Sequence, residues 1–310
     1  MKRIGVAVGM VVAAWFAATP CWGQEQPQRP KILGIAGVRI RVTSFCDSDW
    51  FYAQVTGQKT RCVVAGGAQP DQGTRGLWSG QQLELNNHSL YGPEPDTKNR
   101  VEEVAFVVDS AVRMTSYLEA KGIKTSKATY PVRVAGIMVI DPEGHRIEFV
   151  EDELRDEASR PDVKGIQRSR IIHAGWVVKD REAMDKFYKD VLGFHLYWQG
   201  GMKDERVDWV SMQVPDGTDW IEYMLNIPPD ANKHLLGVMN HIALGVPSVQ
   251  AAAEQLKKNG VKLTEEPKIG RDGKWQLNLY DPDDTRVELM EFTPVEKPCC
   301  AEFTGTHPKP

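Results

Sequence analysis

The sequence predicts an α+β fold built from two similar halves. "WFYAQVTGQK" at 50–59 resembles "KFYKDVLGFH" at 186–195, and "DPEGHRIEFVE" at 141–151 resembles "DPDDTRVELME" at 281–291. The paired segments are offset by 136 to 140 residues, which indicates two copies of one architecture separated by small loop insertions. In each copy, strand patterns flank amphipathic helix patterns. This order predicts curved mixed sheets with helices on their outer faces.

The repeated unit is clearest in the second half. The strand pattern "IIHAGWVV" at 171–178 precedes a helix pattern at 180–193, where Gly193 is the expected stop. Three strand-like runs follow, namely "FHLYWQG", "RVDWVSMQV" and "DWIEYMLN". The pattern then restarts with "MNHIALGV", the helix pattern "SVQAAAEQLKKNG", and the runs "VKLTEEPKI", "WQLNLYDP" and "TRVELMEF". This gives two βαβββ modules per half and four in the chain.

The domain boundaries follow from the repeat. We expect the first domain at 32–152 and the second at 168–294. The segment 153–167 between them is charged and contains proline, which is typical of an exposed linker. Residues 295–310 contain several prolines and lysines, and we expect them to form a flexible tail.

The first 23 residues have the pattern of a secretory signal peptide. A basic start is followed by an apolar run at 4–18 and by small residues up to Gly23, after which cleavage is expected. A retained membrane anchor is the alternative, but the run is shorter than the ~20 residues that a span needs. Lipidation at Cys21 is a weaker alternative. We therefore expect an exported protein, periplasmic or secreted, without stable membrane contact after signal removal.

Four cysteines remain after the predicted cleavage: Cys46, Cys62, Cys299 and Cys300. An even number permits disulfides in an oxidising compartment. Cys46 and Cys62 are close enough in sequence to join a helix to a neighbouring strand, although unpaired thiols remain an equal alternative. The spacing fits no zinc motif.

Composition restricts the partners. The chain has 310 residues, a net charge of −4 and no basic stripe, so nucleic acid is a poor candidate. A small-molecule substrate fits better. The sequence leaves open whether the protein is a monomer or a homodimer.

Two histidines and two glutamates in the second half are candidate metal ligands. His173 and His241 begin strand patterns, and Glu222 and Glu288 lie in the last strand of each module. A carboxylate on the inner face of a sheet is costly unless it is paired or binds a metal. Two neutral imidazoles with two carboxylates suit a divalent transition ion, for which we consider Ni, Zn, Fe, Mn and Co. Coordination positions left open for substrate would mark a catalytic site.

Each of these residues also has a purely structural interpretation. A histidine at a strand start often bonds only to backbone groups, and a strand glutamate often faces solvent. Their positions favour the metal site, because His173 and His241 each lie seven residues before a helix-opening residue, Asp180 and Ser248.

The segments "NHIALGVPSVQAAAEQLKKNGVKL" and "LYDPDDTRVELMEF" resemble the vicinal oxygen chelate superfamily. This superfamily includes glyoxalase I, extradiol dioxygenases, methylmalonyl-CoA epimerases and bleomycin resistance proteins. The resemblance implies tandem domains, each with two βαβββ modules around a metal. The glyoxalase-like ligand set corresponds to His173, Glu222, His241 and Glu288 in this chain.

The same resemblance implies a reaction. A glyoxalase I-like lyase or isomerase would act through a metal-stabilised enediolate on a small carbonyl or hydroxy-carbonyl substrate. Glu222 or Glu288 would be the catalytic base, with Glu222 preferred. Glutathione adducts and CoA esters are cytoplasmic metabolites, so the expected export leaves the substrate open.

Two alternatives remain. Extradiol dioxygenases use two His and one Glu with a catalytic Tyr, and here Asn278 stands at the Tyr position while Glu222 adds a fourth ligand. Both departures disfavour ring cleavage of an aromatic substrate. A non-catalytic binding protein of the bleomycin resistance type is the other alternative, but such proteins lack a metal set.

The first half keeps the frame but loses the imidazoles. Gly37 and Glu103 stand where the second half has its histidines, whereas Glu84 and Glu148 keep the carboxylate positions. This indicates a degenerate site that supports the other half. The alternative is a site for a hard metal or another ligand that uses the three glutamates.

Aromatic residues lie near the expected pocket. Trp209, Trp220 and Asn278 are the predicted substrate-binding residues, and Trp198 and Tyr223 lie on the same group of strands. These aromatic residues indicate an apolar or aromatic ligand, with ordinary core packing as the alternative.

Overall fold

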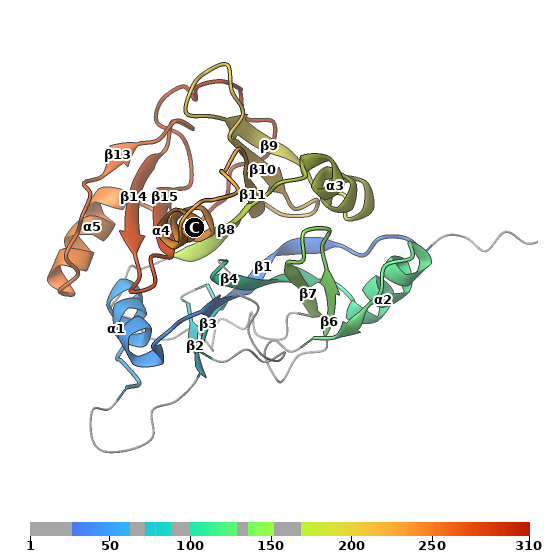
Figure 1. Ribbon diagram of the computed structural model, residues 1–310, viewed down its shortest axis with the longest axis horizontal. Helices are drawn as coiled ribbons and strands as arrows, with labels where there is room; N and C mark the ends of the chain where they lie inside the picture. Colours follow the sequence, from blue (N-terminus) through green and yellow to red (C-terminus); the bar gives the residue numbers. More distant parts are fainter. Residues whose placement is uncertain (1–26, 63–71, 78, 88–98, 129–135, 152–168) are drawn as a thin grey trace, which may run out of the picture.

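The protein is described by a computed structural model that covers residues 27–62, 72–77, 79–87, 99–128, 136–151 and 169–310. The predicted signal peptide and the predicted linker at 153–167 lie outside these residues. Two curved mixed sheets form the body of the molecule (Figure 1). The predicted α+β class is confirmed.

The first sheet has seven strands in the order β2-β3-β1-β4-β7-β6-β5. Its elements are β1 (Ile32–Arg41), α1 (Phe45–Thr56), β2 (Gln72–Gly76), β3 (Gln82–Asn86), β4 (Val101–Val108), α2 (Ala111–Ala120), β5 (Ser126–Lys127), β6 (Gly136–Ile140) and β7 (Arg146–Glu151).

The second sheet has eight strands in the order β13-β14-β15-β12-β8-β11-β10-β9. Its elements are β8 (Arg170–Val177), α3 (Arg181–Asp185), a π-helical turn (Lys186–Val191), β9 (His195–Gly200), β10 (Trp209–Gln213), β11 (Trp220–Met224), α4 (Lys233–Met239), β12 (His241–Val246), α5 (Val249–Lys258), β13 (Lys268–Ile269), β14 (Trp275–Tyr280) and β15 (Arg286–Glu291).

The modules pair within each half. The first strands of the two modules are antiparallel neighbours, β1 with β4 and β8 with β12. Each of these four strands has the last strand of its own module as a parallel neighbour on the other side. The first and last strands of the modules therefore lie side by side in each sheet. In the second sheet, these four strands carry the candidate metal ligands.

Helices α1 and α5 lie at one flank of the two sheets and α2 and α3 at the other, whereas α4 lies on the pocket side of the second sheet (Figure 1). Polar residues fix where helices begin. Ser110 before α2 and Ser248 before α5 each accept a hydrogen bond from a backbone N–H in the first turn. Helix α5 buries Val249, Ala252 and Leu256 against the core. These contacts follow the 3.6-residue repeat on which the prediction depended.

Three elements differ from the predicted pattern. The predicted helix at 180–193 changes after Asp185 into a π-helical turn, in which the adjacent Phe187 and Tyr188 are both buried. A regular helix turns by about 100° per residue, and the wider turn lets both rings reach the core. The predicted run at 261–269 is a strand only at Lys268–Ile269. The short helix α4 was not predicted.

The two sheets share one hydrophobic core and several cross-sheet hydrogen bonds. The side-chain amide of Gln81 donates to the carbonyls of Ile35 and Ile171, 2.9 and 2.8 Å away, and accepts from the backbone N–H of Ile171 at 2.7 Å. Gln81 thereby joins β1 to β8 at one residue of each strand. The second sheet is held in a fixed position against the first.

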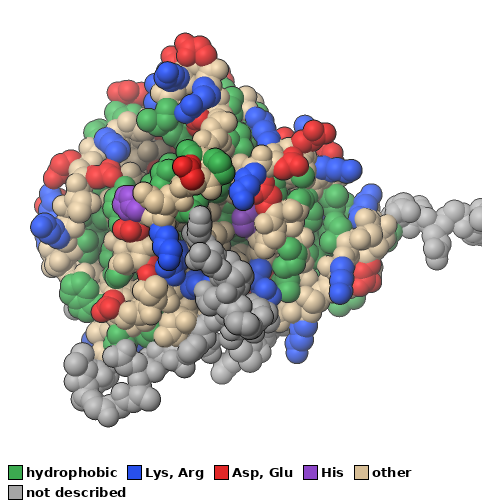
Figure 2. All heavy atoms as spheres, in the orientation of Figure 1, with side chains coloured by type: hydrophobic (Ala, Val, Ile, Leu, Met, Phe, Trp, Pro, Cys, Tyr) green, Lys and Arg blue, Asp and Glu red, His purple; other side chains and the backbone are tan. Residues whose placement is uncertain are grey.

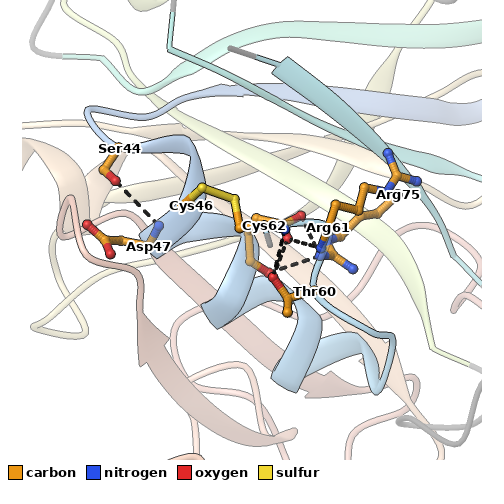
Figure 3. The surroundings of a disulfide bond; sticks show 8 residues. Ser44, Cys46, Asp47, Thr60, Arg61, Cys62 and Arg75 are labelled. Carbon is orange, nitrogen blue, oxygen red and sulfur yellow. Dashed lines mark hydrogen bonds and ion pairs between the residues drawn. A yellow bond between two sulfur atoms is a disulfide. The ribbon is translucent and has the colours of Figure 1, made fainter. Parts of the chain in front are cut away.

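Two disulfides are present in the described residues. Cys46 in α1 is bonded to Cys62 (Figure 3). The side chain of Asp49, also in α1, accepts from the hydroxyl of Thr60 and from the backbone N–H of Arg61. The pairing therefore ties α1 to the segment that follows it. Cys299 and Cys300 form a bond between adjacent residues.

The C-terminal segment differs from the predicted flexible tail. Residues 299–309 lie against β9 and β10 of the second sheet, with backbone and side-chain hydrogen bonds to Tyr197, Trp198 and Gln213. Composition does not reveal this docking, because it depends on residues about one hundred positions earlier.

Acidic and basic side chains are interspersed on the face drawn in Figure 2. No helix in the described part of the chain combines the length and apolarity that crossing a bilayer requires.

Candidate functional site

The four predicted metal ligands meet on the inner face of the second sheet. They come from four adjacent strands, β15, β12, β8 and β11. Strand register explains why they share a face, since a side chain two residues along a strand points the same way. The two cross-strand rows are Glu288–Ala243–His173–Trp220 and His241–Gly175–Glu222.

The distances between their ligand atoms are short. Nε2 of His173 lies 3.0 Å from Nε2 of His241. Oε2 of Glu222 lies 3.9 and 3.3 Å from these two atoms, and Oε2 of Glu288 lies 3.6 and 3.8 Å from them. Atoms bound ~2.1 Å from one ion are separated by about 3 to 4 Å. The His–His and His–Glu separations fit that range, and the ligand atoms of His173, Glu222 and His241 all lie within 4.8 Å of one another.

Both imidazoles are fully buried, and burial lowers the pKa of His173 and of His241 well below the usual value. Nδ1 of His241 lies 2.9 Å from the carbonyl oxygen of Met239, which fixes the proton on Nδ1 and leaves a lone pair on Nε2. Neutral rings that present Nε2 to each other and to two carboxylates form an electron-rich set. Such a donor set fits a divalent transition metal.

A glycine makes room for one imidazole. A Cβ at Gly175 would lie 2.1 Å from Cε1 of His241, far inside van der Waals contact. Any side chain at this position would therefore displace the ring. Sequence patterns do not mark this glycine, because the His241 ring that it accommodates belongs to a strand that is adjacent in space but distant in the sequence.

The two carboxylates differ in environment. The side chain of Glu288 is 4% exposed, and burial raises its pKa to about 7. The side chain of Glu222 is 13% exposed, and its Oε1 accepts a hydrogen bond from the Ser211 hydroxyl at 3.4 Å. Glu222 is thus the more accessible carboxylate from the pocket side.

A pocket of about 360 Å³ opens onto these carboxylates. Aromatic and sulfur-containing side chains form much of its wall, and three basic side chains, Lys268, Arg271 and Arg286, also line it. The lining includes Tyr197, Trp198, Met202, Trp209, Trp220, Glu222, Met224, Lys268, Arg271, Arg286, Glu288, Met290 and Phe303.

Of the three predicted substrate-binding residues, two are in the lining of the pocket and Asn278 is not. Trp209 and Trp220 line the pocket, as does Trp198. Asn278 pairs with Glu288 in the β14–β15 register, but its amide donates to Glu265 at 3.2 Å. Tyr223 lies on the other side of the sheet and packs in the main core, where its ring centre is 6.1 Å from that of Tyr188.

A buried lysine beside the pocket was not predicted. Lys274 is 0% exposed, and its ammonium donates to the hydroxyl of Tyr197 at 3.0 Å. It lies 5.0 to 5.2 Å from the ring centres of Tyr197, Trp220 and Phe303. Burial lowers the pKa of Lys274 to about 8. In sequence it is an ordinary loop lysine, and no pattern distinguishes it.

The corresponding place in the first sheet holds an arginine. Arg39 is buried, and its guanidinium donates to Oε2 of Glu103 at 2.8 Å and to Oε2 of Glu84 at 3.1 Å. These carboxylates therefore have an internal cation as partner. Two of the three glutamates of the alternative site, Glu84 and Glu103, are thus paired with a guanidinium.

The chain was compared with known protein families and with curated proteins. Residues 170–289 match the model of the glyoxalase/bleomycin resistance protein/dioxygenase superfamily. The human mitochondrial methylmalonyl-CoA epimerase is 30% identical over 130 residues, which cover 40% of this chain and 72% of the epimerase. The chain belongs to this superfamily. The resemblance found in the sequence is thus confirmed.

Other superfamily members show the same regional similarity. Lactoylglutathione lyase of Haemophilus influenzae is 27% identical over 124 residues, 39% of this chain and 92% of the lyase. A probable chloroplastic lactoylglutathione lyase of Arabidopsis thaliana is 28% identical over 137 residues, 43% of this chain. The match covers only 39% of the Arabidopsis protein. These relatives are named as enzymes.

Solved structures of superfamily dioxygenases share the fold. The 2,3-dioxygenase LapB of Pseudomonas sp. KL28 has a TM-score of 0.62 at 18% identity and covers 91% of this chain and 96% of its own. A variant of homoprotocatechuate 2,3-dioxygenase from Brevibacterium fuscum has a TM-score of 0.59 at 18% identity, with 86% and 73% covered. At this identity the likeness concerns the fold alone.

Proposed function

We propose that this chain is an exported, metal-dependent enzyme that moves a proton next to a substrate carbonyl, as a glyoxalase I-like lyase or isomerase. The observation that carries the proposal is the cluster of two neutral, buried imidazoles and two carboxylates at the base of a pocket. The relatives named lactoylglutathione lyase and methylmalonyl-CoA epimerase support this reaction class.

The metal would be held by His173, Glu222, His241 and Glu288. When bound, a divalent ion polarises a carbonyl oxygen and thereby makes the adjacent C–H more acidic. The fixed tautomer of His241 keeps a lone pair aimed into the site. Gly175 keeps the space that this ring needs.

Glu222 is the proposed base. Its carboxylate lines the pocket and is more exposed than that of Glu288, so a substrate C–H can approach it. It would accept the proton from the hydroxyl-bearing carbon next to the carbonyl and return it to the former carbonyl carbon, while the hydroxyl proton passes to the former carbonyl oxygen, so that no external oxidant or reductant is consumed. The hydroxyl of Ser211 donates to the other carboxylate oxygen and orients the group.

Export is supported by the sequence pattern at 1–23 and by the two disulfides, which persist in oxidising compartments. A substrate outside the cytoplasm would differ from the glutathione and CoA conjugates in the relatives' names. We therefore propose a small carbonyl or hydroxy-carbonyl compound.

The first test is metal analysis of the purified protein. We expect about one divalent ion per chain, at least a tenfold loss of it in His173→Ala and His241→Ala, and no loss in His234→Ala, whose side chain is 64% exposed. Metal-free protein that still binds ligands in its pocket would instead indicate a binding protein.

The second test is proton exchange. Hydroxyacetone and 2-hydroxyacetophenone in D₂O should incorporate deuterium next to the carbonyl with the wild type and at least a hundredfold more slowly with Glu222→Gln. Oxygen uptake by the ferrous protein on catechols, without such exchange, would refute the proposal in favour of a dioxygenase.

A further inference from the structure

The segment 301–307 lies along the second sheet, with bends at Ala301 and Gly305. Ala301, Phe303, Gly305 and His307 are half-buried, and the residues between them are more exposed. The whole segment lies after the residues that match the superfamily model, 170–289.

Hydrogen bonds fix this segment along its length. The indole of Trp198 donates to the carbonyl of Ala301 at 3.1 Å, and the backbone N–H of Thr304 donates to the carbonyl of Tyr197 at 2.9 Å. The amide of Gln213 donates to the carbonyl of Thr306 at 2.8 Å. Bonds at several points keep the side chains at defined positions.

Two inward residues fit closely against the sheet. A Cβ at Gly305 would lie 2.2 Å from Oε1 of Gln213, so a side chain at this position would force the Gln213 amide to move. Nδ1 of His307 lies 2.7 Å from the hydroxyl of Tyr197, which also accepts from the buried ammonium of Lys274. The segment is thus connected to a polar group beside the pocket.

Phe303 is the part of the segment that lines the pocket. Its ring centre is 4.9 Å from that of Tyr197, which is 4.9 Å from that of Trp220, which is 4.7 Å from that of His173. A continuous series of ring contacts therefore runs from a metal-ligand candidate to the C-terminal segment. Trp198 and Trp209, nearly parallel at 20°, extend the same wall.

We propose that residues 301–307 are a specificity element, and that they make the pocket select substrates with a planar aromatic group next to the metal-binding oxygen atoms. The inference rests on the proposed metal site but not on the proposed proton transfer. A pocket of about 360 Å³ has room for a single aromatic ring beside a small chelating group. Aromatic walls favour such a ring through stacking and edge contacts.

The test compares mandelate with lactate, which offer the same hydroxy-carboxylate unit and differ by phenyl against methyl. Calorimetric titration of the metal-loaded full chain should show mandelate binding at least tenfold more tightly. Phe303→Ala and Phe303→Leu should reduce this ratio below about threefold, because they weaken the binding of mandelate more than that of lactate. Glu302→Ala, whose side chain faces solvent, is the matched control and should keep the wild-type ratio.

Three outcomes of the titrations overturn the proposal. A ratio near one in the wild type, or an unchanged ratio in both Phe303 variants, would remove the specificity role. An equal loss of both ligands would show that the segment only supports folding or metal binding. A preference for mandelate without deuterium exchange on 2-hydroxyacetophenone would refute the proposed reaction alone, whereas exchange without that preference would refute this inference alone.

Discussion

Arg39 of the first sheet and Gly175 of the second occupy equivalent positions. Arg39 is paired with Glu84 on one side and Glu103 on the other, and Gly175 is paired in the same way with Glu222 and with the position of a histidine. In one sheet a guanidinium reaches the carboxylates, and in the other an absent side chain leaves space for an imidazole. The residue at this one position therefore distinguishes the two sites: Arg39 supplies a cation to the carboxylates of the first sheet, and Gly175 leaves room for a metal ligand in the second.

Gly175→Ala should weaken metal binding. The added Cβ would lie 2.1 Å from the His241 ring, which must then move away from the other ligands. We expect metal affinity to fall at least tenfold, measured by competition with a chelator. Gly76→Ala is the control, because no atom lies within 4 Å of its Cβ position. Wild-type metal affinity in Gly175→Ala would contradict the geometry of the site.

Arg39→Met should destabilise the protein without removing the metal. It removes the guanidinium that bonds to both Glu84 and Glu103, and breaking a buried ion pair costs about 3 to 5 kcal/mol. Urea unfolding measures this loss. Arg113→Met, at an ion pair whose arginine is 59% exposed, should change stability by less than about 1 kcal/mol. An equal effect of the two substitutions would disprove a stabilising role for the buried cation.

The repeated pattern predicted the fold and the location of the ligands because strand periodicity and module order are local properties. His173, Glu222, His241 and Glu288 come together through register between adjacent strands, which a duplicated βαβββ pattern specifies. Helix α4 could have been predicted from a sequence signal, namely an N-cap residue. Asn232 caps this helix by accepting a hydrogen bond from the backbone N–H of Leu235.

Other parts of the site depend on contacts that no local pattern encodes. Lys274 is buried because rings from β9, β11 and the C-terminal segment surround it. Phe303 belongs to a segment whose composition is typical of loose tails, yet it docks through partners on β9 and β10. The ion pairs of Arg39 likewise form only because β1 lies between β3 and β4, which carry Glu84 and Glu103. Tertiary packing determines these features.

Two reciprocal hydrogen bonds join the halves. The hydroxyl of Tyr52 donates to Asp281 at 3.1 Å, and that of Tyr188 donates to Asp141 at 3.2 Å. Tyr52→Phe and Tyr188→Phe should each lower the free energy of unfolding by about 1 to 2 kcal/mol, because each leaves a buried carboxylate oxygen with one donor fewer. Urea unfolding of both single variants and the double variant tests this. Stability equal to the wild type in the double variant would show that these bonds contribute nothing.

Lys274 should make stability depend on pH in the alkaline range. Burial lowers its pKa to about 8 in the folded protein from 10.5. Between these values the unfolded chain binds a proton that the folded protein does not bind, so stability rises with pH by roughly 3 kcal/mol at most. Below about pH 8 both states carry the proton and this contribution is constant. Lys274→Met should therefore lack the rise.

The measurement is the free energy of unfolding in urea from pH 7.5 to 9.5 at fixed ionic strength. This range stays below the ordinary pKa of tyrosine, so that phenol ionisation in the unfolded chain adds little. Lys297→Met removes a lysine charge whose side chain is 82% exposed and should keep the wild-type rise. Parallel curves for the wild type and Lys274→Met would show that the buried ammonium does not change its protonation in this range.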